Sequence, residues 1–159
     1  MTTKNTNLVA NFEATPQVAN SASELAGVLR TAHGSVELAA GDSTDNDIVM
    51  LAPIPSNASI PTLFVGSDTF GGSCTFNVGI YQADGTVKDE DVFATSVADA
   101  AALTDVRYEA ADLNTGSKKL WELAGDSEDP GGYFYIAITF NATGGTAGTL
   151  NWNINYVVN

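Results

Sequence analysis

The sequence has little positive charge: six Lys and Arg residues stand against 19 Asp and Glu residues, so the formal net charge is −13. Proteins that bind nucleic acids draw much of their affinity from basic side chains that neutralise phosphates. The sequence also lacks an apolar run of the roughly 20 residues that a membrane-spanning helix needs, and its acidity disfavours anionic lipid surfaces. We therefore expect neither a nucleic-acid partner nor a membrane partner.

Cysteine and histidine are almost absent, with one residue of each, Cys74 and His33. A single cysteine forms no intrachain disulfide, and one Cys with one His cannot supply the four ligands of a typical zinc site. Cys74 lies in an alternating apolar segment, which indicates a small buried side chain. A triad built on His33 has no support, because the nucleophile-elbow pattern G-x-S-x-G is missing. The sequence predicts no catalytic residue, no cofactor and no zinc.

Acidic residues gather in turns, and two groups have the composition of a calcium loop. Residues 42–47 and residues 126–129 hold three acids each. Calcium takes six to eight oxygen ligands, often from such turns, but the first group does not have the spacing of an EF-hand loop. Solvated turns are the preferred interpretation, and calcium binding stays an open alternative.

Two acids outside turns, Glu37 and Glu109, fall in strand-like segments. A glycoside hydrolase on a β-sandwich would need such a pair, but we favour a structural ion pair of either acid with Arg30 or Arg107. Trp121 is a candidate platform for stacking a sugar ring. Its place in the short stretch KKLWELAG indicates instead that it packs a helix onto a sheet.

Alternating apolar and polar residues predominate from Leu25 onward, which is typical of β-strands. Asp84-Gly85 predicts a type I′ hairpin turn, and residues 142–148 predict a hairpin between the last two strands. Strands are predicted at 25–38 (in two pieces around His33-Gly34), 48–54, 60–66, 74–82, 92–95, 106–110, 133–141 and 150–158, with short helices at 96–103 and 117–124. Pro53 and Pro55 place the strand at 48–54 at a sheet edge or end it there. This spacing predicts an all-β fold, a β-sandwich or jelly roll of about seven to nine short strands with two short helices.

The first 23 residues differ from the rest of the chain. They are rich in Asn, Thr and Ala, carry only two charged residues, Lys4 and Glu13, and show no helical or strand period. We predict an extended N-terminal arm over 1–23 attached to a single β-sandwich domain over 24–159. Such a segment suits strand addition or strapping across a neighbouring subunit, although a frayed terminus is the alternative. The predicted partner-binding residues are Asn5, Asn7, Leu8, Val9, Asn11 and Phe12.

Four stretches spread over the chain are KNTNLVANF, VELAAGDSTDNDIVML, KLWELAG and GTLNWNINYVV. In these the sequence resembles capsid decoration (cement) proteins of tailed bacteriophages, especially those of marine phages. The resemblance implies a non-enzymatic virion protein that forms a homotrimer, binds the major capsid protein on the outer capsid surface and ties neighbouring subunits together. Because the N-terminal stretch lacks the apolar run of a secretory signal, we expect synthesis in the host cytoplasm. A head-fibre or tail-associated module that binds a host receptor or glycan is the alternative.

Overall fold

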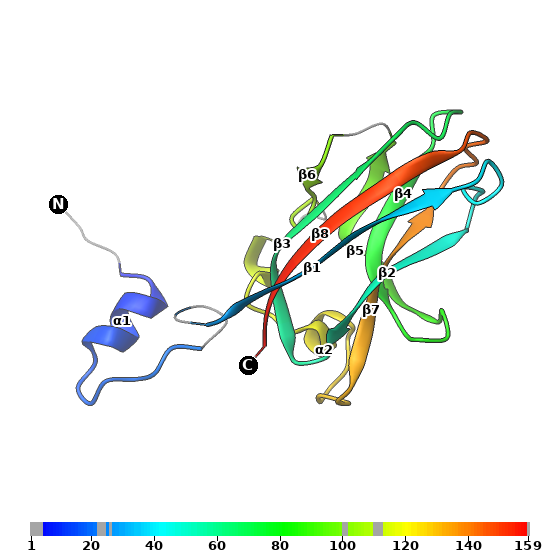
Figure 1. Cartoon of the computed structure of the whole chain (residues 1–159). Helices are drawn as coiled ribbons and strands as arrows, with labels where there is room; N and C mark the ends of the chain where they lie inside the picture. The colour runs from blue at the N-terminus through cyan, green and yellow to red at the C-terminus, as the bar shows by residue number, and fades with distance from the viewer. Residues whose placement is uncertain (1–4, 22–24, 26, 100–101, 110–112, 159) are drawn as a thin grey trace.

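The computed structural model describes residues 5–21, 25, 27–99, 102–109 and 113–158. Within them, two four-stranded antiparallel sheets enclose one apolar core (Figure 1). The prediction of an all-β sandwich is confirmed, and the eight strands fall within the predicted number. The first sheet has the order β1 (Leu29–Leu38), β8 (Gly148–Val158), β3 (Ala58–Ser67) and β6 (Thr104–Asp105); the second has the order β2 (Ile48–Pro55), β7 (Tyr133–Phe140), β4 (Thr75–Tyr81) and β5 (Val87–Ala98).

The strand pairing is nested. β1 pairs with β8, β2 with β7, β3 with β6 and β4 with β5, all antiparallel. The chain is therefore organised as one long hairpin that has its tip between β4 and β5 and is rolled into two sheets. Eight strands arranged in this way form a jelly roll. As a consequence, most consecutive strands lie in opposite sheets, and their connections cross from one sheet to the other.

Helical structure is limited to short pieces. α1 (Asn7–Glu13) and α2 (Leu120–Leu123) are α-helices, and η1 (Leu113–Thr115) is a single 3₁₀ turn. In the described part of the chain, none of the helices is long and apolar enough to cross a membrane. α2 lies inside the predicted stretch 117–124 and ends before Gly125, which has a φ of +79° and so suits the left-handed position after a helix. α1 differs from the sequence prediction, which expects an extended arm without regular structure there.

Three connections differ from their predicted form. Residues 142–148 form no hairpin, because β7 and β8 belong to different sheets. The predicted break at His33-Gly34 is absent, since every residue of β1 pairs with β8. The hairpin at Asp84-Gly85 is formed, but its turn is not type I′. Only the glycine has a positive φ, and its N–H donates to the carbonyl of Gln82 at 3.0 Å. This geometry is that of a type I turn followed by a left-handed residue.

Two predicted elements are wrong. The expected helix at 96–103 is replaced by the end of β5, which reaches Ala98. Its alanines favour a helix, but pairing with β4 outweighs that preference, and the Ser96 N–H donates to Asn77 Oδ1 at 2.9 Å. The expected strand at 106–110 is also wrong, because β6 ends at Asp105 and a turn follows. Residues 100, 101 and 110 lie outside the described residues.

The central strand β4 is buried on both faces, which alternation alone does not predict. Its residues Phe76, Val78 and Ile80 enter the core, where Phe140 packs edge-on against the Phe76 ring at 6.1 Å. The opposite face is covered by β5, which has extra residues between its pairs with Ile80 and Val78. Any Cβ added at Gly79 would overlap the backbone of Asp89 and Glu90 in this covering segment.

We predict that Gly79→Ala lowers the free energy of unfolding by about 3 kcal/mol, because the added methyl group meets backbone that cannot rotate away. Gly41→Ala is the matched control, since its added Cβ meets nothing within 4 Å. Urea denaturation followed by tryptophan fluorescence measures both variants. Equal stability of the two would show that the covering segment moves aside readily.

Candidate partner-binding surfaces

The N-terminal arm is folded on itself and stands away from the sandwich (Figure 1). After α1 the chain turns back, and the Val18 N–H donates to the Asn11 carbonyl at 3.1 Å. Asn20 closes the loop: it accepts from Asn11 Nδ2 at 2.8 Å and donates to the Leu8 carbonyl at 3.2 Å. The asparagines that are frequent in this segment thus tie it together with uncharged polar contacts.

The arm contributes nothing to the core. Among the described residues before β1, none is buried. Phe12 on α1 is 65% exposed, and Val28 at the junction with β1 is 74% exposed. Val9, Val18 and Leu25 are exposed as well, so apolar side chains gather in the part of the chain that the sandwich does not cover. Exposed apolar residues of this kind mark an interaction site where they form one patch.

The six predicted partner-binding residues all lie in α1 or directly before it, but they divide into two groups. Leu8 and Asn11 take part in the internal ties of the arm, and Asn5 donates to Glu13 at 3.1 Å. Val9 and Phe12 are exposed, and so is Asn7. Whether this group binds a partner stays a prediction.

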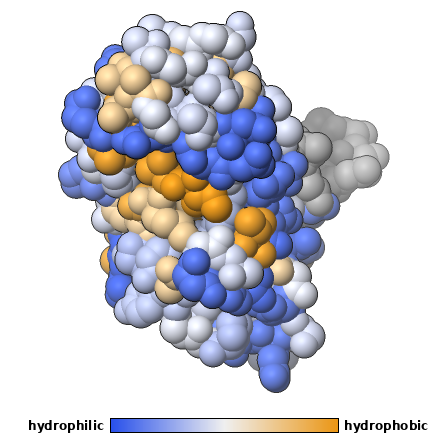
Figure 2. Space-filling model, turned by 90° about the vertical axis from the view of Figure 1, so that its right-hand side faces the viewer, coloured by the Kyte–Doolittle hydropathy of each residue, from blue (hydrophilic) through white to orange (hydrophobic). Residues whose placement is uncertain are grey.

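A second surface lies where the end of β1 meets the start of β2. Both are outermost strands of their sheets. For β2 this agrees with the edge position that Pro53 and Pro55 allow. Figure 2 shows an apolar patch bordered by polar residues on the face that carries these strand ends. We call the depression there the β1–β2 groove; it has a volume of about 420 Å³ and is lined by Leu38, Gly41, Asp42, Asp47, Ile48, Val49 and Met50.

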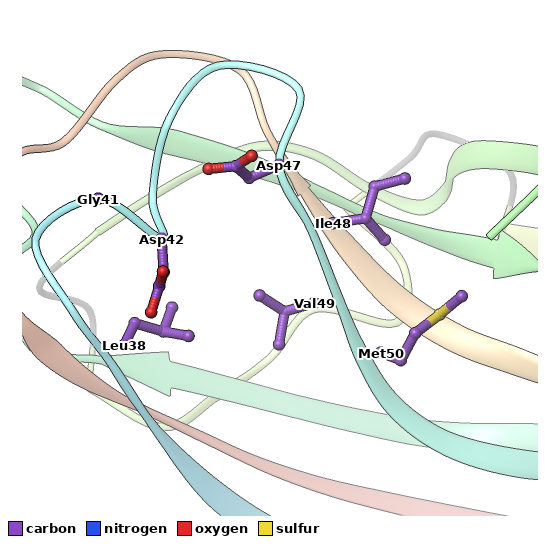
Figure 3. A pocket seen from close by; sticks show the side chains of 7 residues that line it. All are labelled: Leu38, Gly41, Asp42, Asp47, Ile48, Val49 and Met50. Carbon is purple, nitrogen blue, oxygen red and sulfur yellow. The ribbon is translucent and has the colours of Figure 1, made fainter.

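The side chains of the β1–β2 groove have a clear arrangement (Figure 3). Leu38, Asp42 and Val49 point toward a common space, with Asp47 above it, whereas Ile48 and Met50 project from the other side of β2. The strand register agrees, because Val49 pairs with Ile138 of the core. The groove therefore has apolar residues at its base and two carboxylates above them.

Both carboxylates of the groove are fixed by backbone amides. Asp42 Oδ2 accepts from the Ala39 N–H at 2.9 Å, and Asp47 Oδ2 accepts from the Thr44 N–H at 2.8 Å. The hydroxyl and the amide of Thr44 lower the pKa of Asp47 below its ordinary value. Within the described residues, no group of three acidic, His or Cys side chains is arranged to hold a metal ion. The acids in this loop thus serve as turn acceptors.

The two acids considered for catalysis, Glu37 and Glu109, are not brought together as a pair. Glu37 accepts from the Thr149 hydroxyl at 2.6 Å, and Glu109 is exposed. The ion pairs predicted for them are wrong, since the described residues form one ion pair, Lys88 with Asp126 at 2.8 Å. At Asp129, another turn acid, the carboxylate accepts from Ser56 and Gly131.

Of the other residues considered for function, Cys74 and Trp121 have packing roles and His33 lies at the surface. Cys74 is buried as predicted, its thiol donates to the Ala142 carbonyl at 3.2 Å, and burial raises its pKa. His33 is exposed on β1, beside a shallow depression that Trp152 also lines. Trp121 packs against the core, and its backbone N–H donates to the Ser56 carbonyl at 3.1 Å. It attaches α2 to the sandwich, as predicted, and is half-buried.

The structure reveals one buried charge that sequence reasoning misses, Arg107. Its side chain is 1% exposed, and its guanidinium lies 5.0 Å from the ring centres of both Phe93 and Tyr108. The Nε donates to the Ile60 carbonyl at 2.7 Å and Nη2 to the Thr115 carbonyl at 2.9 Å. Burial lowers the pKa of Arg107. Because β3 departs from its ladder with β8 between Ser59 and Thr62, the arginine supplies a donor where strand pairing is interrupted.

No protein-family model matches the sequence, and no curated protein matches it. Among solved structures, a chain of the cyanophage Pam1 capsid asymmetric unit matches with a TM-score of 0.44 and 16% identity over 84% of this chain and 86% of that one. A chain of the infectious bursal disease virus Gx strain matches with a TM-score of 0.44 and 16% identity, over 82% of this chain and 32% of that one. A chain from the acid-stable capsid of Helicobacter pylori bacteriophage KHP30 matches with a TM-score of 0.37 and 13% identity, over 82% of this chain and 94% of that one. Two of the three are phage capsid structures. With TM-scores below 0.5, these similarities carry no weight for function.

We predict that Arg107→Met lowers the free energy of unfolding by about 3 kcal/mol, because it removes the donors and leaves the buried Ile60 carbonyl without them. Arg30→Met on the exposed start of β1 is the matched control and should change stability by less than about 0.5 kcal/mol. Thermal and urea unfolding provide the comparison. A neutral Arg107→Met would mean that the buried arginine adds no net stability.

Proposed function

We propose that this chain is a structural virion protein that binds the outer surface of a tailed-phage capsid and stabilises it by bridging neighbouring capsid subunits. The observation that carries the proposal is the N-terminal arm, with its exposed apolar side chains beside a sandwich that is complete without them. The resemblance of the sequence to capsid decoration proteins supports the major capsid protein as the partner. The homotrimer rests on that resemblance.

The sandwich is suited to a mechanical function. Its apolar core spans both sheets, and the described acids and the single His and Cys occupy turns, exposed positions or buried structural contacts rather than a shared site. Its acidity supports an outer location, because a net charge of −13 would be repelled by packaged DNA.

Repetition over the capsid lattice accounts for stable attachment. Burying one side chain such as Phe12 contributes about 1.5–3 kcal/mol, and part of that is lost in ordering the arm. A single arm therefore binds weakly. An oligomer that engages several subunits at once gains effective concentration, and binding that requires the assembled shell stabilises the shell over its free subunits.

Deleting residues 1–23 tests the arm. We expect the remaining chain to fold with an unchanged melting temperature, because no described residue of that segment is buried, and to lose binding to capsid shells in a sedimentation assay. A finer variant is Phe12→Ser, with Val87→Ser as control, an exposed apolar residue on β5. Only the first should weaken binding, by about tenfold or more. Normal shell binding by the truncated chain would refute the function of the arm.

Copy number separates the proposed function from the head-fibre or tail alternative. A lattice-wide bridging protein should be present in near-stoichiometric ratio to the major capsid protein in purified virions, as measured by quantitative mass spectrometry. A few copies per particle would instead support a fibre or tail component that binds a receptor or glycan. Absence from virions would overturn both.

A further inference from the structure

We infer that the β1–β2 groove docks a basic side chain, arginine or lysine, from the capsid subunit that this chain binds. The inference rests on the proposed function for the identity of the partner. It names a second contact surface, separate from the N-terminal arm, and the chemistry that this surface recognises.

The shape and apolar base of the groove suit a long side chain with an apolar stem. Leu38 is a buried core residue, and Val49 packs against the core but is only half-buried. Both lie at this side of the sandwich because β1 and β2 are edge strands. Because Val49 is only half-buried, the chain itself does not cover the base of the groove completely. Arginine and lysine bury their methylene stems on apolar surface while the charged head stays at the polar rim.

The charges of the groove select the head group. Asp42 and Asp47 each use Oδ2 for a backbone N–H, and Oδ1 of each makes no hydrogen bond within the described part of the chain. The ion pair of Lys88 is with Asp126, so no described basic residue of this chain neutralises the two carboxylates. Charged donors make the strongest hydrogen bonds to such acceptors, and the arginine fork matches a carboxylate best.

Comparison with the other depressions supports this choice. The one beside His33 and Trp152 contains no carboxylate, and the one beside Tyr133 contains a single one, Asp84. A second copy of this chain is a poor occupant of the groove, because it has only six Lys and Arg residues, of which Arg107 is buried and Lys88 is ion-paired. The occupant that complements the groove is a basic residue of a different protein.

The double variant Asp42→Asn with Asp47→Asn tests the inference. Asparagine keeps an acceptor oxygen for each turn and removes only the charge. The matched control is the double variant Asp84→Asn with Asp129→Asn, which also removes two negative charges. These two carboxylates likewise accept turn amides, from Thr86 and Gly131, and they lie at the opposite end of β2 and β7. Thermal unfolding verifies that both double variants fold.

The first probe is the synthetic peptide Val-Arg-Val-Arg-Val, titrated into the full chain and followed by NMR. We expect saturable shifts confined to residues 38–50 and an affinity about five- to tenfold lower for the Asp42/Asp47 double variant than for the control. The peptide Val-Glu-Val-Glu-Val should cause no such shifts. Shifts spread over the whole acidic surface, or equal affinity for both double variants, would overturn the inference.

The second probe is a capsid shell that lacks this chain. We expect the Asp42/Asp47 double variant to bind it at least about fivefold more weakly than the control. If the chain binds shells and both double variants bind equally, the groove inference fails and the proposed function stands. If the arginine peptide maps to the groove but the chain does not bind shells, the proposed function fails and the basic-side-chain site stands.

Discussion

The nested pairing of strands is the constraint on which the rest of the structure depends. Because β4 and β5 form the tip of one long hairpin, every other pair joins residues progressively farther apart in the sequence, up to Leu29 with Val157. The two sheets can close only when both halves of the chain are in place. β4 is buried on both faces because it lies inside its sheet and is overlaid by the extra residues of β5. Gly79 is the point at which this overlay excludes any side chain.

Strict alternation of apolar and polar residues predicts most strands of the sandwich. The wrong predictions concern features that alternation does not report. β7 and β8 have one apolar face each and agree closely with their predicted ranges. The connection between them was misassigned, because local patterns give the length of a loop but not the sheet to which the next strand belongs. β5 was misassigned at its alanine-rich end, where cross-strand contacts with β4 outweigh local propensity. Arg107 could not be predicted as buried, since its acceptors, the carbonyls of Ile60 and Thr115, are brought to it only by the fold.

Several carboxylates of this molecule lie in turns between strands, whereas exposed apolar side chains are most frequent before β1. Carboxylates accept backbone amides in the turns, as at Asp42, Asp47 and Asp129, so the acidity that defines the sequence also fixes the ends of the strands. Exposed apolar side chains are most frequent before β1, and the β1–β2 groove adds Ile48. The composition of the arm was predictable from the sequence, whereas the groove was not, because Leu38 and Val49 come together only when two edge strands meet.

β1 connects the two proposed contact surfaces. Its first residue, Leu29, follows the N-terminal segment of the chain, and its last residue, Leu38, lines the β1–β2 groove. A strand of ten residues is about 30 Å long, at roughly 3.3 Å per residue. One strand, paired along its whole length with β8, therefore separates the N-terminal segment from the β1–β2 groove, the two surfaces for which we propose partner contacts. Two contacts separated by a paired strand of this length can engage two different subunits, which is the geometry that the proposed bridging function requires.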